Sequence, residues 1–348
     1  MFKSRIHKLA VAGLVASLAA SVVPPALRAQ SAAPINISGS STVGPITDLA
    51  IKGFQSTAAG KTANFSKVIE NGTSGGFRDF CANKTVVSNA SRPINAKEMK
   101  ACEAAGVSFY EVPVGFDAIT VVVNKANSWA KSISLAELRR LWNSDATGKV
   151  DKWNEVSLDW PSKPVKLFGP GKDSGTFDYF NKAINGDAAN TRTDVVTSED
   201  DNALVQGVAA NPNALGYFGF AYYKANQDKL RALAIEGPKG TVLPSVKTVQ
   251  NETYLPLSRP IFIYVNDKEL SANAKLRAFV DYYINNAARL VEQEGSVPLT
   301  ASQYRLVQNQ LARQIRGSAF SGDLPVGLTL GNILNMKIDK VKKAEFRN

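Results

Sequence analysis

The sequence predicts an α/β fold with two lobes. Short apolar runs typical of strands alternate with amphipathic helical segments along most of the chain. Two longer apolar runs, at 113–124 and 254–266, have the composition of strands that are buried on both faces. The length of 348 residues also exceeds one ordinary domain. We therefore expect one lobe from 34–112 plus 260–348 and a second from 113–259. The two long strands would cross between the lobes, with a ligand cleft beside them.

The individual elements follow from local patterns along the chain. Strands are expected where apolar residues alternate or run together, at 35–38, 64–70, 85–94, 107–124, 164–168, 215–223 and 253–266. Helices are expected where apolar residues recur every three or four positions, at 46–57, 77–84, 94–106, 134–142, 176–184, 201–210, 272–295 and 304–315. Ser134 with Glu137 forms a capping box that marks the start of one of these helices.

The N-terminus has the pattern of a secretory signal. Three basic residues, Lys3, Arg5 and Lys8, precede an apolar run from Leu9 to Val23 that ends at two prolines. We expect residues 1–33 to be a signal peptide that is removed on export. The apolar run is too short to span a membrane as a helix, so the expected location of the rest of the chain is the periplasm.

The residue counts exclude several classes of function. The single histidine, His7, lies in the predicted signal, which argues against Ser-His-Asp catalysis and histidine-ligated zinc. We expect neither a metal nor a cofactor. The net charge of +11 suits an anionic ligand or an anionic surface, but no dense basic run with interleaved aromatic residues indicates a nucleic-acid partner. The only cysteines, Cys81 and Cys102, are expected to form a disulfide worth about 2–4 kcal/mol.

Three segments share one pattern, in which a strand ends in a Gly-, Ser- and Thr-rich loop that opens a helix. The start of a helix exposes unpaired N–H groups and a partial positive charge, so small hydroxyl residues there can hold an oxyanion. A simple helix cap is the alternative interpretation of each segment. The candidate anion-binding residues are Ser41, Thr42 and Val43 in the first segment, Thr73 and Ser74 in the second, and Ser174, Gly175 and Thr176 in the third.

Two further features concern chemistry at these loops. The second loop, Gly72–Gly76, matches the G-x-S-x-G pattern of a serine hydrolase, but Ser74 has no histidine to serve as its base. Arg92 precedes Pro93 at the end of an expected strand, which disfavours helical geometry and lets the side chain leave the strand. Its guanidinium fork matches an oxyanion, and a surface salt bridge is the alternative.

Taken together, these segments resemble a known family. GSSTVGP, NGTSGGF, ASRPI, FDAITVVVN, FGPGKDSGTFDYF and LGYFGFAYY occur in this order, with a spacing similar to that of the periplasmic phosphate-binding component of the phosphate ABC transporter, the PstS family. The resemblance covers nearly the whole chain after the signal. It implies a type II periplasmic-binding-protein-like fold without catalysis, which binds inorganic phosphate with high affinity and passes it to a membrane permease. We expect the protein to be a monomer. Thr42, Val43, Thr73, Ser174, Gly175 and Thr176 match phosphate contacts, with Ser41 and Ser74 beside them.

The chain departs from the family pattern at two positions. Pro170 stands where the family has a phosphate-binding arginine, and the aspartate that accepts the phosphate proton is missing near Arg92. We hypothesise that Arg92 supplies the missing guanidinium, because each charge-assisted hydrogen bond contributes about 1.5–3 kcal/mol. Asp201 or a hydroxyl lone pair is then the candidate proton acceptor.

Three other functions remain open from the sequence. The missing aspartate leaves room for another oxyanion, such as sulfate, molybdate or a phosphonate. A secreted phosphatase using Ser74 is the enzymatic alternative, although base and metal ligands are scarce. An added adhesive or signalling role is compatible with the same sequence.

Overall fold

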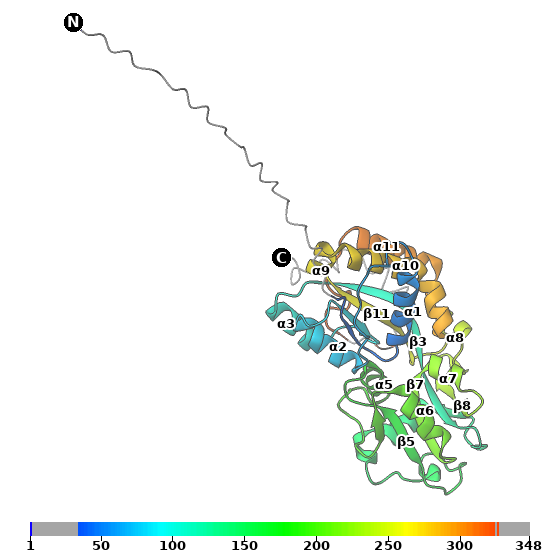
Figure 1. Cartoon of the computed structure of the whole chain (residues 1–348). Coiled ribbons are helices and arrows are strands. Elements are labelled where there is room, and N and C mark those ends of the chain that lie inside the picture. The colour runs from blue at the N-terminus through cyan, green and yellow to red at the C-terminus, as the bar shows by residue number, and fades with distance from the viewer. Residues whose placement is uncertain (2–33, 324–325, 327–348) are drawn as a thin grey trace. The chain divides into compact units, whose positions relative to one another are not determined.

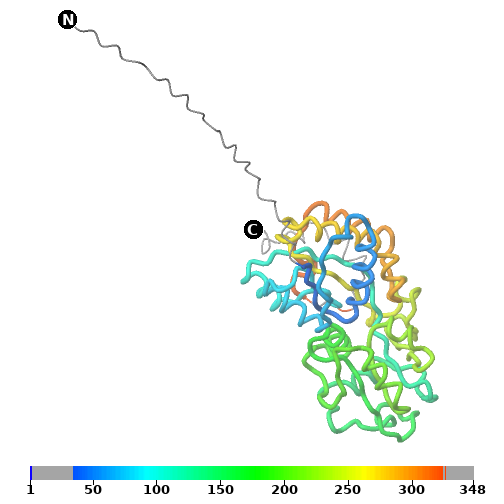
Figure 2. The backbone as a smooth tube through the Cα atoms, viewed as in Figure 1, coloured from blue at the N-terminus to red at the C-terminus, as the bar shows by residue number. Residues whose placement is uncertain are grey.

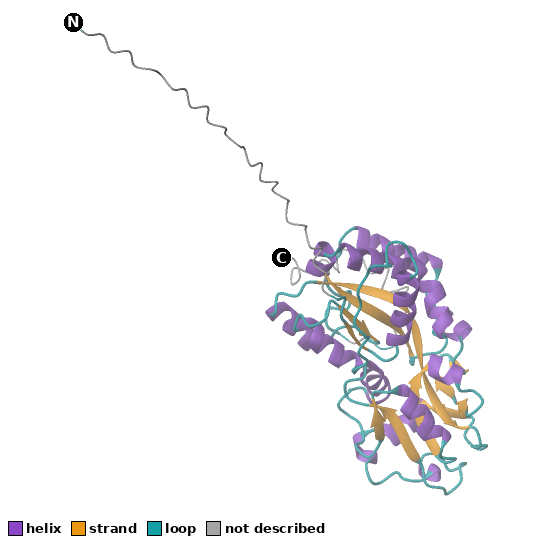
Figure 3. Ribbon diagram, in the orientation of Figure 1, coloured by secondary structure: helices purple, strands orange, loops and turns teal. Residues whose placement is uncertain are grey.

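The computed structural model describes Met1, residues 34–323 and Val326. Apart from Met1, the predicted signal at 1–33 lies outside the described residues. The predicted α/β class is confirmed, since strands and helices alternate from Ile37 to Ala312. Figure 1 labels these elements, and Figure 3 shows helices flanking the strands.

The long strand β3 (Phe109–Asn124) is the centre of an eight-stranded sheet with the order β1-β2-β11-β3-β7-β5-β6, in which β8 also pairs with β3. The first half of β3 pairs antiparallel with β11 (Ser258–Asn266), as far as Ala118 opposite Ser258. From Ile119 onward β3 pairs antiparallel with β7 (Ala214–Gly219) instead. Because it changes partner halfway, β3 belongs to two groups of strands.

The first strand group holds β1 (Ile37–Gly39) and β2 (Val87–Ala90), which are parallel to each other, together with β11 and the first half of β3. Its long apolar strands are buried at nearly every position, which explains why they show no alternation. The helices of this group are α1 (Gly44–Gln55), α2 (Gly72–Cys81), α3 (Ala96–Ala104), α9 (Asp267–Ala272), α10 (Ala274–Glu294) and α11 (Ala301–Ala312).

The second strand group holds β5 (Lys166–Pro170), β6 (Val196–Ser198), β7, β8 (Leu230–Ala232) and the second half of β3. A separate three-stranded sheet contains β4 (Ser132–Ser134), β9 (Ala234–Gly237) and β10 (Gly240–Val242). The helices are α4 (Leu135–Trp142), α5 (Gly175–Asn185), α6 (Asp201–Ala209), α7 (Phe220–Ala225) and α8 (Val246–Gln250). In Figure 2 the green part of the chain gathers in this group, and the blue, yellow and orange parts gather in the first.

Helix starts follow the sequence closely where a polar side chain caps them. Ser134 and Glu137 form the predicted capping box at α4. The Ser174 side chain accepts a hydrogen bond from the backbone of Thr176 and caps α5, and Asp200 caps α6 by accepting one from the backbone of Asn202. These local signals depend on two to four neighbouring residues, which is why the sequence locates them well.

Several boundaries differ from the prediction, and four segments show why. Residues 64–70 do not form a strand, since only isolated bridges at Phe65 and Ile69 tie them to β1 and its neighbour Ile35. The run 215–223 is part strand and part helix, because β7 ends at Gly219 and α7 follows directly. The glycine-rich loop 72–76 is itself the first turn of α2, and β5 continues through Pro170. In each case tertiary pairing decides a segment whose local pattern is ambiguous.

The predicted disulfide is confirmed. Cys81 and Cys102 are bonded, which joins the end of α2 to α3. Both cysteines are buried. The link holds α2, whose first turn contributes Thr73 to the polar cluster described next, to α3, whose first turn carries Glu98.

Candidate functional site

A buried polar cluster lies where the two strand groups meet. Its members come from loops and strand ends far apart in sequence, and each is less than one-tenth exposed. They are Ser40, Ser41, Thr42, Thr73, Ser91, Arg92, Asp117, Ser174, Thr176, Asp201 and Arg259. Buried polar groups are costly unless they are hydrogen-bonded, so their partners determine what the cluster can bind.

The first predicted loop contacts two helices of the second strand group, α6 and α7. The Ser41 hydroxyl donates a 2.8 Å hydrogen bond to Oδ2 of Asp201, the first residue of α6. The Tyr222 hydroxyl donates to the Ser41 carbonyl at 3.1 Å. Val43 precedes α1 without any side-chain cap, and Pro45 occupies the first turn of that helix. The amides at this helix start donate to Ser40 instead, that of Thr42 to its hydroxyl at 3.2 Å and those of Val43 and Gly44 to its carbonyl at 3.1 Å and 2.9 Å.

The second predicted loop is joined to the segment just after β2, which carries Arg92. The hydroxyls of Thr73 and Ser91 lie 3.1 Å apart, and the Ser91 amide donates to the Thr73 hydroxyl at the same distance. The Ser74 amide donates to the carbonyl of Asp173 at 2.9 Å. Gly72 has φ +78° and lies so close to Asp173 that a Cβ would be 2.4 Å from its carbonyl oxygen. Only glycine fits there, which lets α2 and the third loop approach each other.

The third predicted loop meets the second through Gly175. A Cβ on Gly175 would lie 2.6 Å from the hydroxyl oxygens of both Ser91 and Thr73. The first turn of α5 is therefore packed directly against the hydroxyls at the start of α2 and the end of β2. A Cβ on Gly219 would lie 3.5 Å from Cγ2 of Thr42 and 3.3 Å from Oδ1 of Asp117, so the first loop lies beside the buried carboxylate of Asp117, which Arg259 joins to the third loop. Residues of all three predicted loops therefore lie in one buried cluster, although the sequence separates Ser41 from Ser174 by more than a third of the chain.

Arg92 is buried and is fully occupied by protein acceptors. Its Nε donates to Asp178 at 2.6 Å, and its two terminal nitrogens form a bidentate pair with Glu98 at 2.8 Å each. The remaining hydrogens go to the Ser74 hydroxyl at 2.8 Å and the Pro93 carbonyl at 3.0 Å. All five N–H donors of this guanidinium have acceptors within the protein.

Arg259 is a second buried guanidinium that the sequence analysis missed. It stands opposite Asp117 where β11 and β3 pair, and its Nη2 donates to Asp117 Oδ2 at 2.9 Å. Nη1 donates to the Gly175 carbonyl at 2.6 Å, and Nη2 also donates to the Thr176 hydroxyl at 2.5 Å. Among the described residues, one hydrogen on Nη1 has no acceptor. The missed signal was an arginine inside an apolar strand, in the same Ser-Arg-Pro-Ile sequence as Arg92.

Two carboxylates complete the cluster. Asp117 is wholly buried between Arg259 and the start of α7, where its Oδ1 accepts a 3.0 Å hydrogen bond from the Phe220 amide. Burial raises the pKa of Asp201 to about 7, although the hydrogen bond from Ser41 lowers it. Near neutral pH Asp201 can therefore hold or accept a proton.

Ser74 is not arranged as a hydrolase nucleophile. Its hydroxyl accepts a hydrogen bond from Arg92, which is a cation and cannot serve as a base. Within the described part of the chain no group of three or more His, Cys, Asp or Glu residues could hold a metal. In the same part of the chain, no helix is both long and apolar enough to cross a membrane.

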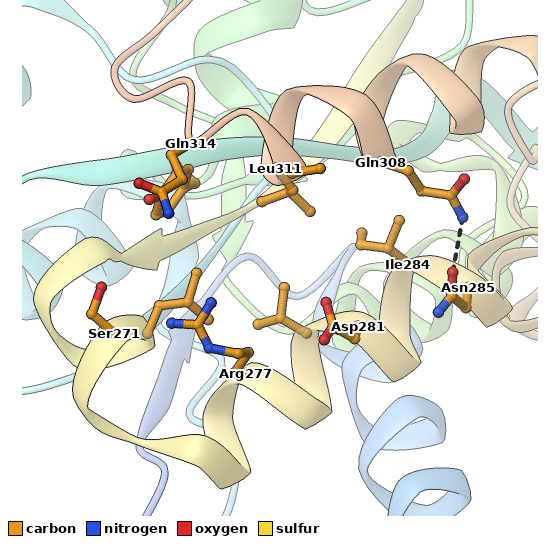
Figure 4. Close-up of a pocket in the computed structure, with 12 residues that line it drawn as sticks. Ser271, Arg277, Asp281, Ile284, Asn285, Gln308, Leu311 and Gln314 are labelled. Carbon is orange, nitrogen blue, oxygen red and sulfur yellow. Dashed lines mark hydrogen bonds between the residues drawn. The ribbon is translucent and has the colours of Figure 1, made fainter.

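A cavity of about 400 Å³ lies elsewhere, among α9, α10 and α11. Figure 4 shows Arg277 and Asp281 on one side of it and Leu311 and Gln308 on the other. None of the residues that line it belongs to the buried polar cluster. The cavity therefore plays no part in the site formed by the three loops.

The class of protein follows from the fold and is supported by comparison with known proteins. A family model described as the PBP superfamily domain matches residues 24–287. The protein SphX of Synechocystis sp. is 43% identical over 331 residues, which are 95% of this chain and 97% of SphX. The phosphate-binding protein PstS of Staphylococcus saprophyticus is 33% identical over 276 residues, 78% of this chain and 82% of PstS.

A solved structure agrees with these relatives. The crystal structure of a possible phosphate binding protein from Planctomyces limnophilus has 39% sequence identity and a TM-score of 0.60, covering 81% of this chain and 98% of that chain. The chain therefore belongs to the PBP superfamily, in the family of SphX and the PstS phosphate-binding proteins. The predicted family resemblance is confirmed.

Proposed function

We propose that this protein binds inorganic phosphate in the periplasm and delivers it to the permease of an ABC transporter, without catalysing a reaction. The relatives with 33% to 43% identity support this, since one is named a phosphate-binding protein. The observation that carries the proposal is the meeting of three hydroxyl-bearing helix starts with Arg259 in one buried cluster. Helix N-termini and a guanidinium are groups that favour a desolvated dianion.

In this proposal the two strand groups are the two lobes, and they close on phosphate where β3 and β11 cross between them. Hydroxyls and amides of Thr42, Val43, Thr73, Ser174, Gly175 and Thr176 surround the anion, with Ser41 and Ser74 beside them. Arg259 supplies the guanidinium that Pro170 cannot. Its remaining N–H faces no protein acceptor among the described residues, whereas the donors of Arg92 are all used.

Asp201 is the proposed proton acceptor for monohydrogen phosphate. It is buried at the start of α6 and bonds Ser41, one of the loop residues. A carboxylate in the site would favour an anion that carries a proton over sulfate, which carries none at neutral pH. A buried acceptor without a donor is costly, so sulfate would be disfavoured.

Calorimetric titration with phosphate and with sulfate, at pH 6 and pH 8, tests the proposal. We expect phosphate to bind at least about 100-fold more tightly than sulfate at pH 8. Tight binding of sulfate, molybdate or a phosphonate without phosphate binding would replace phosphate by that oxyanion. Hydrolysis of a chromogenic phosphomonoester by the wild type, lost in Ser74→Ala, would show that the protein is an enzyme.

A further inference from the structure

Arg92 joins the first turns of two helices that come from different strand groups. Its guanidinium bonds the hydroxyl of Ser74 in α2 and the carboxylate of Asp178 in α5. The bidentate bond to Glu98 anchors it to α3, whose capping box the same carboxylate completes by accepting from the Asn95 amide. One buried side chain therefore connects three helix starts around the polar cluster.

The charges around Arg92 argue against its being an anion ligand. Two carboxylates, Glu98 and Asp178, face one guanidinium, so the ionised group of three has a net negative charge. To donate to phosphate, Arg92 would have to give up one of its five protein acceptors. The three side chains are 2%, 12% and 21% exposed, so solvent cannot easily replace a lost partner.

We infer that Arg92 is a positioning residue, which holds α2 against α5 and so slows the release of bound phosphate without touching it. This inference rests on the proposed function. Of the bonds Arg92 makes, the one to Asp178 is the one that crosses between the strand groups. Without the Asp178 bond the two strand groups would separate more easily, while the bidentate bond to Glu98 would still hold the Arg92 side chain in place. The dissociation rate should therefore change more than the association rate.

The chain contains a matched control on the same two segments. Arg78 in α2 and Asp173, just before α5, form a bidentate pair at 2.7 Å and 2.8 Å. Their side chains are 61% and 41% exposed, in contrast to the buried Arg92. Exposed ion pairs are screened and contribute little, so this pair should have little effect on release although it crosses at the same place.

The test is stopped-flow measurement of phosphate association and dissociation with the purified protein. Asp178→Asn should raise the dissociation rate about tenfold and change the association rate less than twofold, because a charge-assisted bond is weakened. Arg78→Gln should leave both rates within about twofold. Asp178→Glu, which keeps the charge, should recover part of the slow release.

The outcomes separate the inference from the proposed function. If the wild type does not bind phosphate, the proposed function fails. If the wild type binds phosphate and Asp178→Asn releases it at the wild-type rate, Arg92 is not a positioning residue. If Asp178→Asn does not fold by circular dichroism, Arg92→Lys replaces it, since lysine keeps the charge but cannot reach all three helices at once. An unchanged dissociation rate in folded Arg92→Lys would overturn the inference equally.

Discussion

The two Ser-Arg-Pro-Ile segments of this chain place an arginine in the same local sequence but in different surroundings. Arg92, at the end of β2, is bonded by two carboxylates, a hydroxyl and a carbonyl. Arg259, in β11, has a single carboxylate partner, Asp117, and points to the first turn of α5. The comparison shows that the same tetrapeptide can place an arginine beside two carboxylates or beside one, depending on what packs against it.

The strongest test exchanges each arginine for glutamine. We expect Arg259→Gln to weaken phosphate binding at least about 100-fold, and to lower the free energy of unfolding by about 3–5 kcal/mol, because Asp117 is left buried without its cation. Arg92→Gln should weaken binding much less, by about tenfold. Calorimetry and urea unfolding measure both quantities. A larger loss of affinity in Arg92→Gln than in Arg259→Gln would reverse the roles we assign.

Removing the disulfide affects the surroundings of Arg92 and not those of Arg259. Cys81→Ser with Cys102→Ser should lower the free energy of unfolding by about 2–4 kcal/mol, because the unfolded chain loses a cross-link. The bond joins α2 to α3, which carries Glu98, and does not touch Arg259. We therefore expect phosphate affinity to fall no more than about tenfold. Thermal unfolding and calorimetry check this, and a change as large as that of Arg259→Gln would contradict it.

Asp201→Asn tests whether the buried carboxyl group of Asp201 has a raised pKa in the folded protein. The folded-state pKa of Asp201 is raised by burial to about 7, above its usual value of 3.8. The folded protein therefore binds more protons than the unfolded chain in this range, and its stability falls as pH rises from about 4 to about 7. The amide that replaces the carboxyl group does not titrate, so the variant should lose less stability over the same range. Glu111 and Glu294, whose pKa values are similarly raised by desolvation, keep part of the slope. Urea unfolding at several pH values measures how the free energy of unfolding depends on pH. If that dependence is equal in wild type and variant, the pKa of Asp201 is not raised.

The smallest effect is expected at the exposed ion pair. Arg78→Gln should change the free energy of unfolding by less than about 1 kcal/mol, since both partners of Arg78–Asp173 are substantially exposed. A loss above about 2 kcal/mol would mean that exposure is a poor guide to the importance of arginines in this protein.

Much of the fold can be predicted from the sequence, because it depends on nearby residues. The two long buried strands, the capping box of Ser134 and Glu137, and the cap at Ser174 each depend on a few neighbouring residues. The strand predicted at 64–70 is wrong, because a short alternating run becomes a strand only when a neighbour pairs along its whole length. The helix at 220–225 was missed because its residues are as apolar as those of the strand before it.

The candidate site was predictable in part. The hydroxyl loops at Ser41, Thr73 and Ser174 carry a local signature, and the structure brings residues from all three into one buried cluster. The hydrogen-bond partners of Arg92 could not be predicted from a local pattern. Its acceptors Glu98 and Asp178 are 6 and 86 positions away along the chain, and the second of them is contacted only through folding.

By itself, the sequence determined the α/β class, the family, the disulfide partners and the three loops, because each depends on residue type and short-range order. Only the tertiary structure decided which guanidinium keeps an N–H without an acceptor among the described residues. That depends on which carboxylates pack against each arginine, and the pairing of β11 with β3 brings Asp117 to Arg259 across 142 positions of sequence. Burial makes each of these ion pairs important for stability, because a charge that is removed from water must be balanced by neighbours that the fold supplies.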